Sequence, residues 1–226
     1  ILDAGSGIVG VGAAADVAAD VAIVLTHYHW DHVQGLPFFA PLYRQGVRVT
    51  VWAPALERSG AGIDTLFEPP FFPVPYDRLS SQPAIRTIVA GETTINGFEL
   101  SAQPLNHPGG SFAYRIRGSP GDLVYATDHE FGNSEVDAAL TNFAFGAKAL
   151  ILDSHFTPDE MPDHKGRGHS DWERCARFAG ECGAGHLWLF HHKPGRSDED
   201  VRQIEAAARQ VFRETDAAQE GSVFRG

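Results

Sequence analysis

The most constraining feature of this sequence is a run of metal-binding side chains directly after a short apolar segment. Val21–Leu25 is apolar throughout, and it is followed by three histidines and one aspartate in a six-residue stretch: His27, His29, Asp31 and His32. An apolar run of this length predicts a buried strand, and the loop after a strand commonly carries functional groups. Imidazoles and a carboxylate placed this close together suit zinc, iron, nickel and similar ions. The run therefore predicts a metal site at the end of a strand.

The remainder of the chain is predicted to alternate between strands and helices. The spacing of apolar residues and the β-propensity of the sequence indicate strands at 47–52, 84–89, 94–103, 112–117, 122–126, 149–153 and 186–190. Helices are expected at 134–145, at 170–182 behind a capping box opened by Ser170, and at 197–215 behind the cap Ser197. Residues 69–76 contain four prolines and cannot form a regular element. Their aromatic side chains are expected in a lid, in an oligomer contact or in the core.

This order of elements predicts two mixed β/α halves that pack sheet on sheet with helices outside. The 226 residues fit one large domain or two fused half-domains, and we expect a single domain over residues 1–226. The chain begins at Ile1-Leu2-Asp3, without Met and in what reads as the middle of a strand. We therefore expect its natural N-terminal strand to be missing.

Charge and cysteine content narrow the class of protein. The net charge is −11 and neither half of the chain is basic, which argues against binding long nucleic acids. No apolar run approaches the roughly 20 residues that span a bilayer, so no membrane partner is expected. Cys175 and Cys182 are predicted on one helix face about 10 Å apart, too far for a disulfide. Small buried thiols in a reducing compartment are the favoured reading, which predicts a cytoplasmic protein.

Taken with later motifs, the His27–His32 run resembles the signature of the metallo-β-lactamase superfamily. The later motifs occur in the superfamily's order: Leu105-Asn-His107-Pro-Gly-Gly110, Val124-Tyr-Ala-Thr-Asp128 and Leu189-Phe-His191-His192. Asp3 resembles the early aspartate of the Asp-Gly turn that supports the site from behind. The resemblance implies an α/β fold, specifically a four-layer αββα sandwich of two mixed sheets with outer helices.

The resemblance also implies a site for two divalent metal ions, zinc or manganese first and iron or nickel as alternatives. One ion is expected on His27, His29 and His107, and the other on Asp31, His32 and His191, with Asp128 bridging the two. His192 is the alternative to His191 as the last ligand. Class B β-lactamases tend to place Cys where Asp128 stands, so β-lactam hydrolysis is not expected.

A further segment resembles the phosphodiesterase branch of the superfamily, which includes tRNase Z and small cyclic phosphodiesterases. Gly166-Arg-Gly-His169-Ser170 is similar to the Gly-His-Ser segment of that branch. The resemblance implies that His169 stabilises or protonates the leaving group, while Asp31 orients a hydroxide held by the two ions. We expect cleavage of a small or cyclic phosphodiester. One cation among Arg167, Lys193 and Arg196 is expected to meet the phosphate.

Three alternatives stay open at this point. A thioesterase or a lactonase could use the same two ions, and a non-catalytic ligand-binding protein could have kept the site. A homodimer is a further expectation that the sequence does not decide. His129, His155 and His164 are expected to be solvated groups or partners of the ligands rather than ligands.

Overall fold

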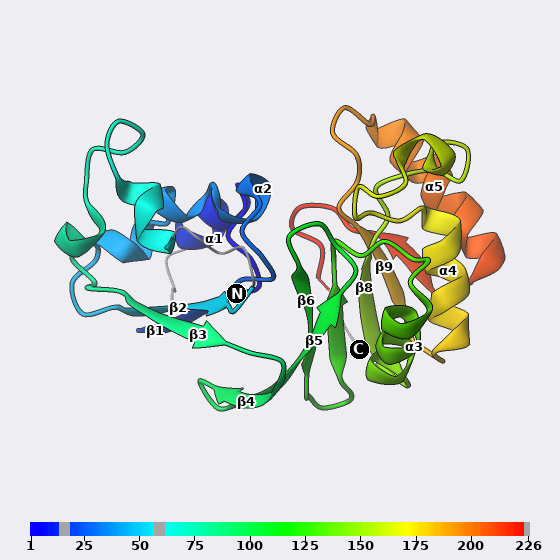
Figure 1. Ribbon diagram of the computed structural model, residues 1–226, viewed down its shortest axis with the longest axis horizontal. Helices are drawn as coiled ribbons and strands as arrows, with labels where there is room; N and C mark the ends of the chain where they lie inside the picture. The colour runs from blue at the N-terminus through cyan, green and yellow to red at the C-terminus, as the bar shows by residue number, and fades with distance from the viewer. Residues whose placement is uncertain (14–18, 57–61, 224–226) are drawn as a thin grey trace. The chain divides into compact units, whose positions relative to one another are not determined.

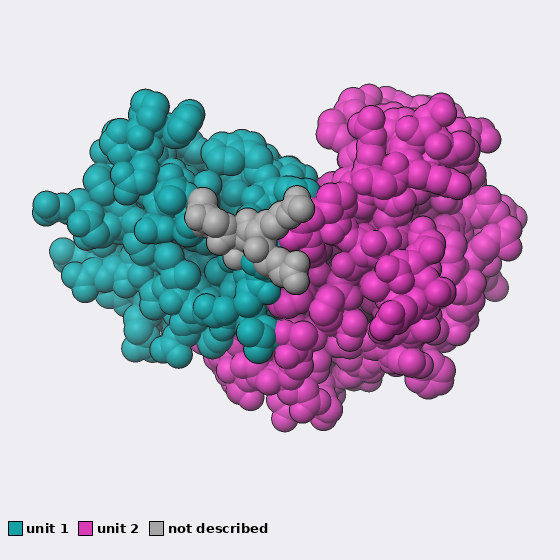
Figure 2. All heavy atoms as spheres, in the orientation of Figure 1, with its two compact units in different colours: residues 1–89 teal, residues 90–226 magenta. Residues whose placement is uncertain are grey.

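The computed structural model describes residues 1–13, 19–56 and 62–223. Contacts within the chain gather in two compact units, Ile1–Val89 (unit 1) and Ala90–Gly226 (unit 2), which Figure 2 shows in two colours. Each unit has its own buried core. The two units are described separately below.

Unit 1 is built on a small parallel sheet. Its strands are β1 (Asp20–Val24), β2 (Arg48–Pro54) and β3 (Ala84–Ile88), with β2 in the centre. Leu2 adds an isolated parallel bridge to Val24, so the start of the chain is extended. The described residues of the unit also form helices α1 (Ile8–Ala13) and α2 (Trp30–Val33) (Figure 1). They form four short 3-10 turns as well: Leu36–Phe38, Ala40–Tyr43, Ile63–Phe67 and Tyr76–Arg78. The described strands of this sheet are all parallel, so the expectation of a mixed sheet is wrong for this unit.

The proline-rich segment 69–76 is irregular up to the 3-10 turn that begins at Tyr76, as predicted. Its two phenylalanines have different environments. Phe71 is 84% exposed, whereas Phe72 packs edge-on against Phe38 and Phe67. The segment is therefore anchored to the core of unit 1 through Phe72, and Val74 and Tyr76 also pack against that core.

Unit 2 is built on a seven-stranded mixed sheet in the order β10-β9-β8-β7-β6-β5-β4. The strands are β4 (Gly91–Ile95), β5 (Phe98–Leu105), β6 (Ser111–Ile116), β7 (Leu123–Ala126), β8 (Ala149–Asp153), β9 (Leu187–Phe190) and β10 (Thr215–Ala217). Strands β4 to β7 pair antiparallel, and β7 to β10 pair parallel. The carboxyl ends of β7, β8 and β9 consequently meet at one edge of the sheet.

Three helices cover one face of this sheet (Figure 1): α3 (Ser134–Ala144), α4 (Trp172–Glu181) and α5 (Asp198–Val211). A 3-10 turn at Met161–His164 precedes α4. Helix α4 turns an apolar face inward that includes Cys175 and Phe178, and α5 buries Ile204 and Ala208. Cys175 and Cys182 are both fully buried, as predicted, and burial raises the pKa of both thiols. Among the residues that the structure describes, no helix is long and apolar enough to cross a bilayer.

Three differences from the predicted elements have a clear physical reason. The strand predicted at 94–103 is a hairpin, because Asn96 and Gly97 adopt left-handed backbone (φ 48° and 82°) and turn the chain between β4 and β5. The N-cap of α4 is Asp171, whose carboxylate accepts the Arg174 N–H at 2.9 Å. The Ser170 hydroxyl is used elsewhere, because it donates to the His129 carbonyl and accepts the Phe131 N–H.

The last helix is shorter than predicted. Ser197 caps α5 in a reciprocal capping box with Asp200, as the sequence indicates at this end. The helix ends at Val211, and Thr215 begins the edge strand β10, paired with Leu187 of β9. A strand of three residues is too short to show a periodic pattern of apolar side chains. Its pairing with β9, which is distant in the chain, could therefore not be predicted from the local sequence.

Candidate metal centre

The loop after β1 in unit 1 carries four of the predicted ligands. His27 and His32 are buried, whereas Asp31 in the first turn of α2 is 55% exposed. The His27 ring centroid lies 4.6 Å from that of His29 and 4.2 Å from that of His32. The Asp31 Oδ2 atom lies 3.5 Å from His32 Nε2. Unit 1 thus gathers three imidazoles and one carboxylate in a single short loop.

Asp3 and Thr26 orient two of these imidazoles. Asp3 accepts hydrogen bonds from the Thr26 N–H at 2.7 Å and from the Thr26 hydroxyl at 3.0 Å, and it lies 2.9 Å from His32 Nδ1. Because the Asp3 carboxylate accepts this hydrogen bond, His32 Nδ1 carries the hydrogen and His32 Nε2 carries the lone pair. The Thr26 oxygen, whose own hydrogen goes to Asp3, accepts from His27 Nδ1 at 3.0 Å, with the same consequence for His27. Metal-binding histidines are commonly held by their second nitrogen in this way.

The predicted ligands of unit 2 follow three of its strands. His107 follows β5, Asp128 follows β7 and His191 follows β9. Asp128 Oδ1 lies 3.9 Å from His107 Nε2 and 3.8 Å from His191 Nε2. These separations exceed a hydrogen bond. In each pair, the separation matches that of two atoms bound to the same metal ion. Metal–ligand bonds of about 2.0–2.2 Å place the two ligand atoms roughly 3–4 Å apart. The donor set therefore fits a divalent metal, and His191 is the histidine that lies beside Asp128 in this set.

His107 is oriented by a backbone carbonyl. Its Nδ1 lies 2.9 Å from the Gly168 carbonyl oxygen, which can only accept, so the lone pair of this ring is also on Nε2. Gly168 has φ +86°, and a Cβ there would lie 2.1 Å from His107 Nδ1. Only glycine allows the loop to lie this close to the ring.

Three of the predicted site residues share an uncommon backbone conformation. Asp3, Asp128 and His191 have φ values of 55°, 58° and 57°, in the left-handed region that non-glycine residues rarely adopt. Such positions cost free energy and persist where the surrounding structure fixes them, often at functional sites. Each of the three ends or follows an extended segment, where the chain must turn sharply to present the side chain.

His169 is held by a carboxylate that sequence reasoning missed. Its Nδ1 lies 2.6 Å from Oδ2 of Asp153, the last residue of β8. Burial raises the pKa of the Asp153 carboxyl, and the hydrogen bond from His169 opposes that rise. The signal was present in the sequence, because Asp153 is a carboxylate that ends an apolar strand just as His27 follows one.

His155 lies among the same side chains. Its ring stacks on His169 at a centroid distance of 4.4 Å, and its Nδ1 lies 3.3 Å from His191 Nδ1 and 3.0 Å from the His191 carbonyl. Burial lowers the pKa of His155 to about 4, so the ring is neutral at pH 7. Ligand atoms of Asp153, His155, His169 and His191 lie within 4.8 Å of one another. His155 is therefore a close neighbour of two predicted site residues.

The three cations proposed for phosphate binding are not equivalent. Lys193 and Arg196 both pair with Glu160, and Arg196 also donates to the His155 carbonyl. Burial disfavours ionisation of Glu160, but these partners outweigh it and hold its pKa at about 2. Arg167 is exposed on the loop that carries His169. Of the three cations, Arg167 is the one for which the described residues show no acidic partner.

Comparison with known proteins identifies the family. A profile of the beta-lactamase superfamily domain matches residues 2–192. The chain belongs to this superfamily. It is 25% identical to ribonuclease Z of Lacticaseibacillus casei over 85% of this chain and 74% of the relative. It is 27% identical to the probable metallo-hydrolase YhfI of Bacillus subtilis over 91% of this chain and 78% of the relative.

Solved structures of the superfamily share the fold. The crystal structure of YhfI matches 99% of this chain and 86% of its own with a TM-score of 0.71 and 23% identity. A diphosphatase of the PhnP family matches 98% of this chain and 77% of its own with a TM-score of 0.68 and 19% identity. The predicted family and the predicted α/β class with two sheets and helices are confirmed. The chain is a metallo-β-lactamase superfamily hydrolase related to ribonuclease Z.

Proposed function

We propose that this hydrolase cleaves a small or cyclic phosphodiester with the help of two divalent metal ions. The observation that carries the proposal is the pairing of His169 with Asp153 on the Gly-His-Ser segment. His169 Nδ1 donates to Asp153, so Nε2 is the nitrogen that would face the substrate. When the ring carries a second proton on Nε2, that N–H can stabilise charge on the leaving oxygen or give it the proton, and the Asp153 carboxylate would stabilise the imidazolium.

The metal ligands are proposed in two sets. His27, His29 and His107 would hold one ion, Asp31, His32 and His191 would hold the other, and Asp128 would bridge them. Asp3, Thr26 and the Gly168 carbonyl support this assignment, since they leave the lone pairs of His27, His32 and His107 on Nε2. When bound, such ions supply a water of lowered pKa and offset charge on the phosphate. Zinc and manganese are the first candidates.

Residues of the chain would then have separate roles in the hydrolysis. Asp31, exposed beside its ring partner His32, would orient the attacking water. His169 would act on the leaving oxygen, and Asp153 would hold the His169 ring. Arg167 is the favoured phosphate contact, because Lys193 and Arg196 are already paired with Glu160. A mononucleotide-sized ligand needs no more positive charge than this.

Precursor tRNA is not the proposed substrate, although one relative is a ribonuclease Z. The tRNA-processing branch carries a long arm that, in its bacterial form, lies between the third metal histidine and the bridging aspartate. Here His107 and Asp128 are 21 positions apart, and the antiparallel strands β6 and β7 occupy that interval. The net charge of −11 also disfavours a long polyanion.

A substrate panel tests the proposal. We expect the metal-loaded protein to hydrolyse bis(p-nitrophenyl) phosphate or a cyclic nucleotide in the presence of manganese or zinc. We expect no specific 3′ processing of precursor tRNA at physiological salt. The same preparation is assayed on a thioester and a lactone, with D128N as the control for contaminating activity. Turnover only of the thioester or lactone, efficient tRNA trimming, or no turnover of any substrate would each contradict the proposal.

A further inference from the structure

We propose that Glu130 is a positioning residue for both His107 and His169. The inference rests on the proposed function for what those two histidines do. Its structural content, a carboxylate that fixes the loop beside them, can be tested in the metal-free protein.

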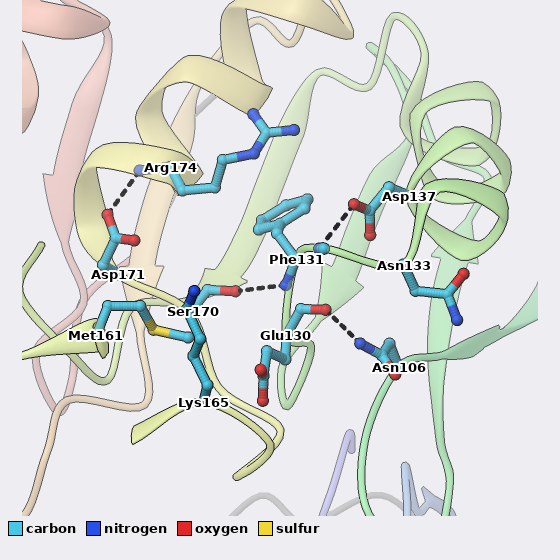
Figure 3. A pocket seen from close by; sticks show the side chains of 11 residues that line it. Asn106, Glu130, Phe131, Asn133, Asp137, Met161, Lys165, Ser170, Asp171 and Arg174 are labelled. Carbon is cyan, nitrogen blue, oxygen red and sulfur yellow. Dashed lines mark hydrogen bonds between the residues drawn. The ribbon is translucent and has the colours of Figure 1, made fainter. Parts of the chain in front are cut away.

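Glu130 is itself held firmly by the backbone. It lies two residues after Asp128, its N–H donates to the Asn106 carbonyl at 2.9 Å, and its carbonyl accepts from Asn106 Nδ2 at 2.7 Å. Figure 3 shows the second of these contacts. Asn106 precedes His107, so the segment that carries Asp128 is tied to the segment that carries His107.

The Glu130 carboxylate accepts from a third segment. Oε1 accepts the Gly166 N–H at 2.8 Å, and Oε2 accepts the Gly168 N–H at 2.7 Å. Both glycines have left-handed backbone, with φ +80° and +86°. One carboxylate therefore binds two amides of the turn that leads into His169. Charge-assisted hydrogen bonds of this type are the stronger ones.

The same turn presents both histidines. Gly168 gives its N–H to Glu130 and its carbonyl to His107 Nδ1, and His169 is the next residue in the chain. Ser170 completes the connection, since its hydroxyl donates to the His129 carbonyl and accepts the Phe131 N–H at 3.3 Å. A shift of the turn would thus move the orienting partner of His107 and the backbone of His169 together.

The two hydrogen bonds from Gly166 and Gly168 require a side chain with two acceptor oxygens, which a carboxylate provides. A glutamine has one acceptor oxygen and one donor NH2 group. Its oxygen can accept the N–H of one of the two glycines, but its NH2 group would face the N–H of the other, and two donors cannot form a hydrogen bond. E130Q keeps the volume of the side chain and should loosen the turn without opening a cavity. Glu130 also lines a hollow of about 650 Å³ with Asn106, Phe131 and Arg174 (Figure 3), so the substitution needs no repacking of the core.

The experiment compares E130Q with E135Q, a matched change at an exposed glutamate in the first turn of α3. Amide exchange of Gly166 and Gly168 is followed by NMR in the metal-free proteins, and metal affinity is measured by chelator competition. In E130Q we expect both amides to exchange about tenfold faster or more. We also expect metal affinity to fall by about 10–100-fold, the usual effect of losing an orienting partner. E135Q should match the wild type in both measurements.

The outcomes separate this inference from the proposed function. Wild-type exchange and wild-type metal affinity in E130Q would overturn the positioning role, whatever the enzyme hydrolyses. Faster exchange and weaker metal binding, in a protein that turns over no phosphodiester, would support Glu130 and refute the proposed substrate. A thermal unfolding midpoint close to that of E135Q shows that a general loss of stability is not the cause.

Discussion

Asp128→Ala is expected to abolish stable binding of the metal pair and to lower hydrolysis by about 10³-fold or more. The proposed bridge contributes to both ions, and charge stabilisation by metal ions supplies several kcal/mol to such reactions. Asp128 Oδ1 lies within 4 Å of Nε2 of both His107 and His191, so its removal takes the shared carboxylate from both. Elemental analysis and phosphodiester assays measure the two effects.

Asp128→Asn is the control for backbone strain. Asp128 has φ 58°, where alanine costs about 1–2 kcal/mol and asparagine is better tolerated. Circular dichroism of the metal-free proteins should show an intact fold for both variants, with a lower unfolding midpoint for alanine. Wild-type metal content in either variant would mean that the bridge is at another residue.

His169→Ala is expected to keep both metals and to slow phosphodiester hydrolysis by about 10²–10⁴-fold, the usual effect of removing a positioned acid–base group. The ring stacks on His155 and bonds to Asp153, but its removal leaves every proposed metal ligand in place. Metal analysis and the steady-state rate are measured on one preparation.

The control for this variant is His186→Ala. His186, just before β9, pairs with Asp216 of β10 outside the proposed site. This variant should hydrolyse the substrate at the wild-type rate. Unchanged turnover in His169→Ala would refute the acid–base role and favour the thioesterase or lactonase alternative. Loss of metal from His169→Ala would instead make this histidine a ligand.

The local part of the site could be predicted from the sequence. His27, His29, Asp31 and His32 are close in the chain and follow one strand, so the structure of a single loop brings them together. His107, Asp128 and His191 required the superfamily order of motifs, because three strands far apart in the chain present them. Strand-end position alone would have left each as one polar residue among many.

The roles of the supporting residues could not be predicted, even where strand-end position marked a candidate such as Asp153, because these roles depend on long-range hydrogen bonds. Glu130 binds amides 36 and 38 positions later, and Asp153 binds a ring 16 positions later. A glutamate after a strand predicts only a polar loop until its partners are known.

One of the boundary errors has the same origin. Ser170 has the sequence of an N-cap, but a carbonyl 41 positions earlier accepts its hydroxyl hydrogen. Asn96-Gly97, by contrast, is a local turn signal inside a longer β-rich stretch, and its chemistry is sufficient to predict the hairpin.

The most direct test of the dimetal account is anomalous diffraction from crystals grown with manganese or zinc. The account predicts two anomalous peaks per chain, both in contact with Asp128. One peak should be bound by His27, His29 and His107, and the other by Asp31, His32 and His191. Fewer than two peaks at full metal loading, or two peaks of which either is bound without Asp128, would contradict it.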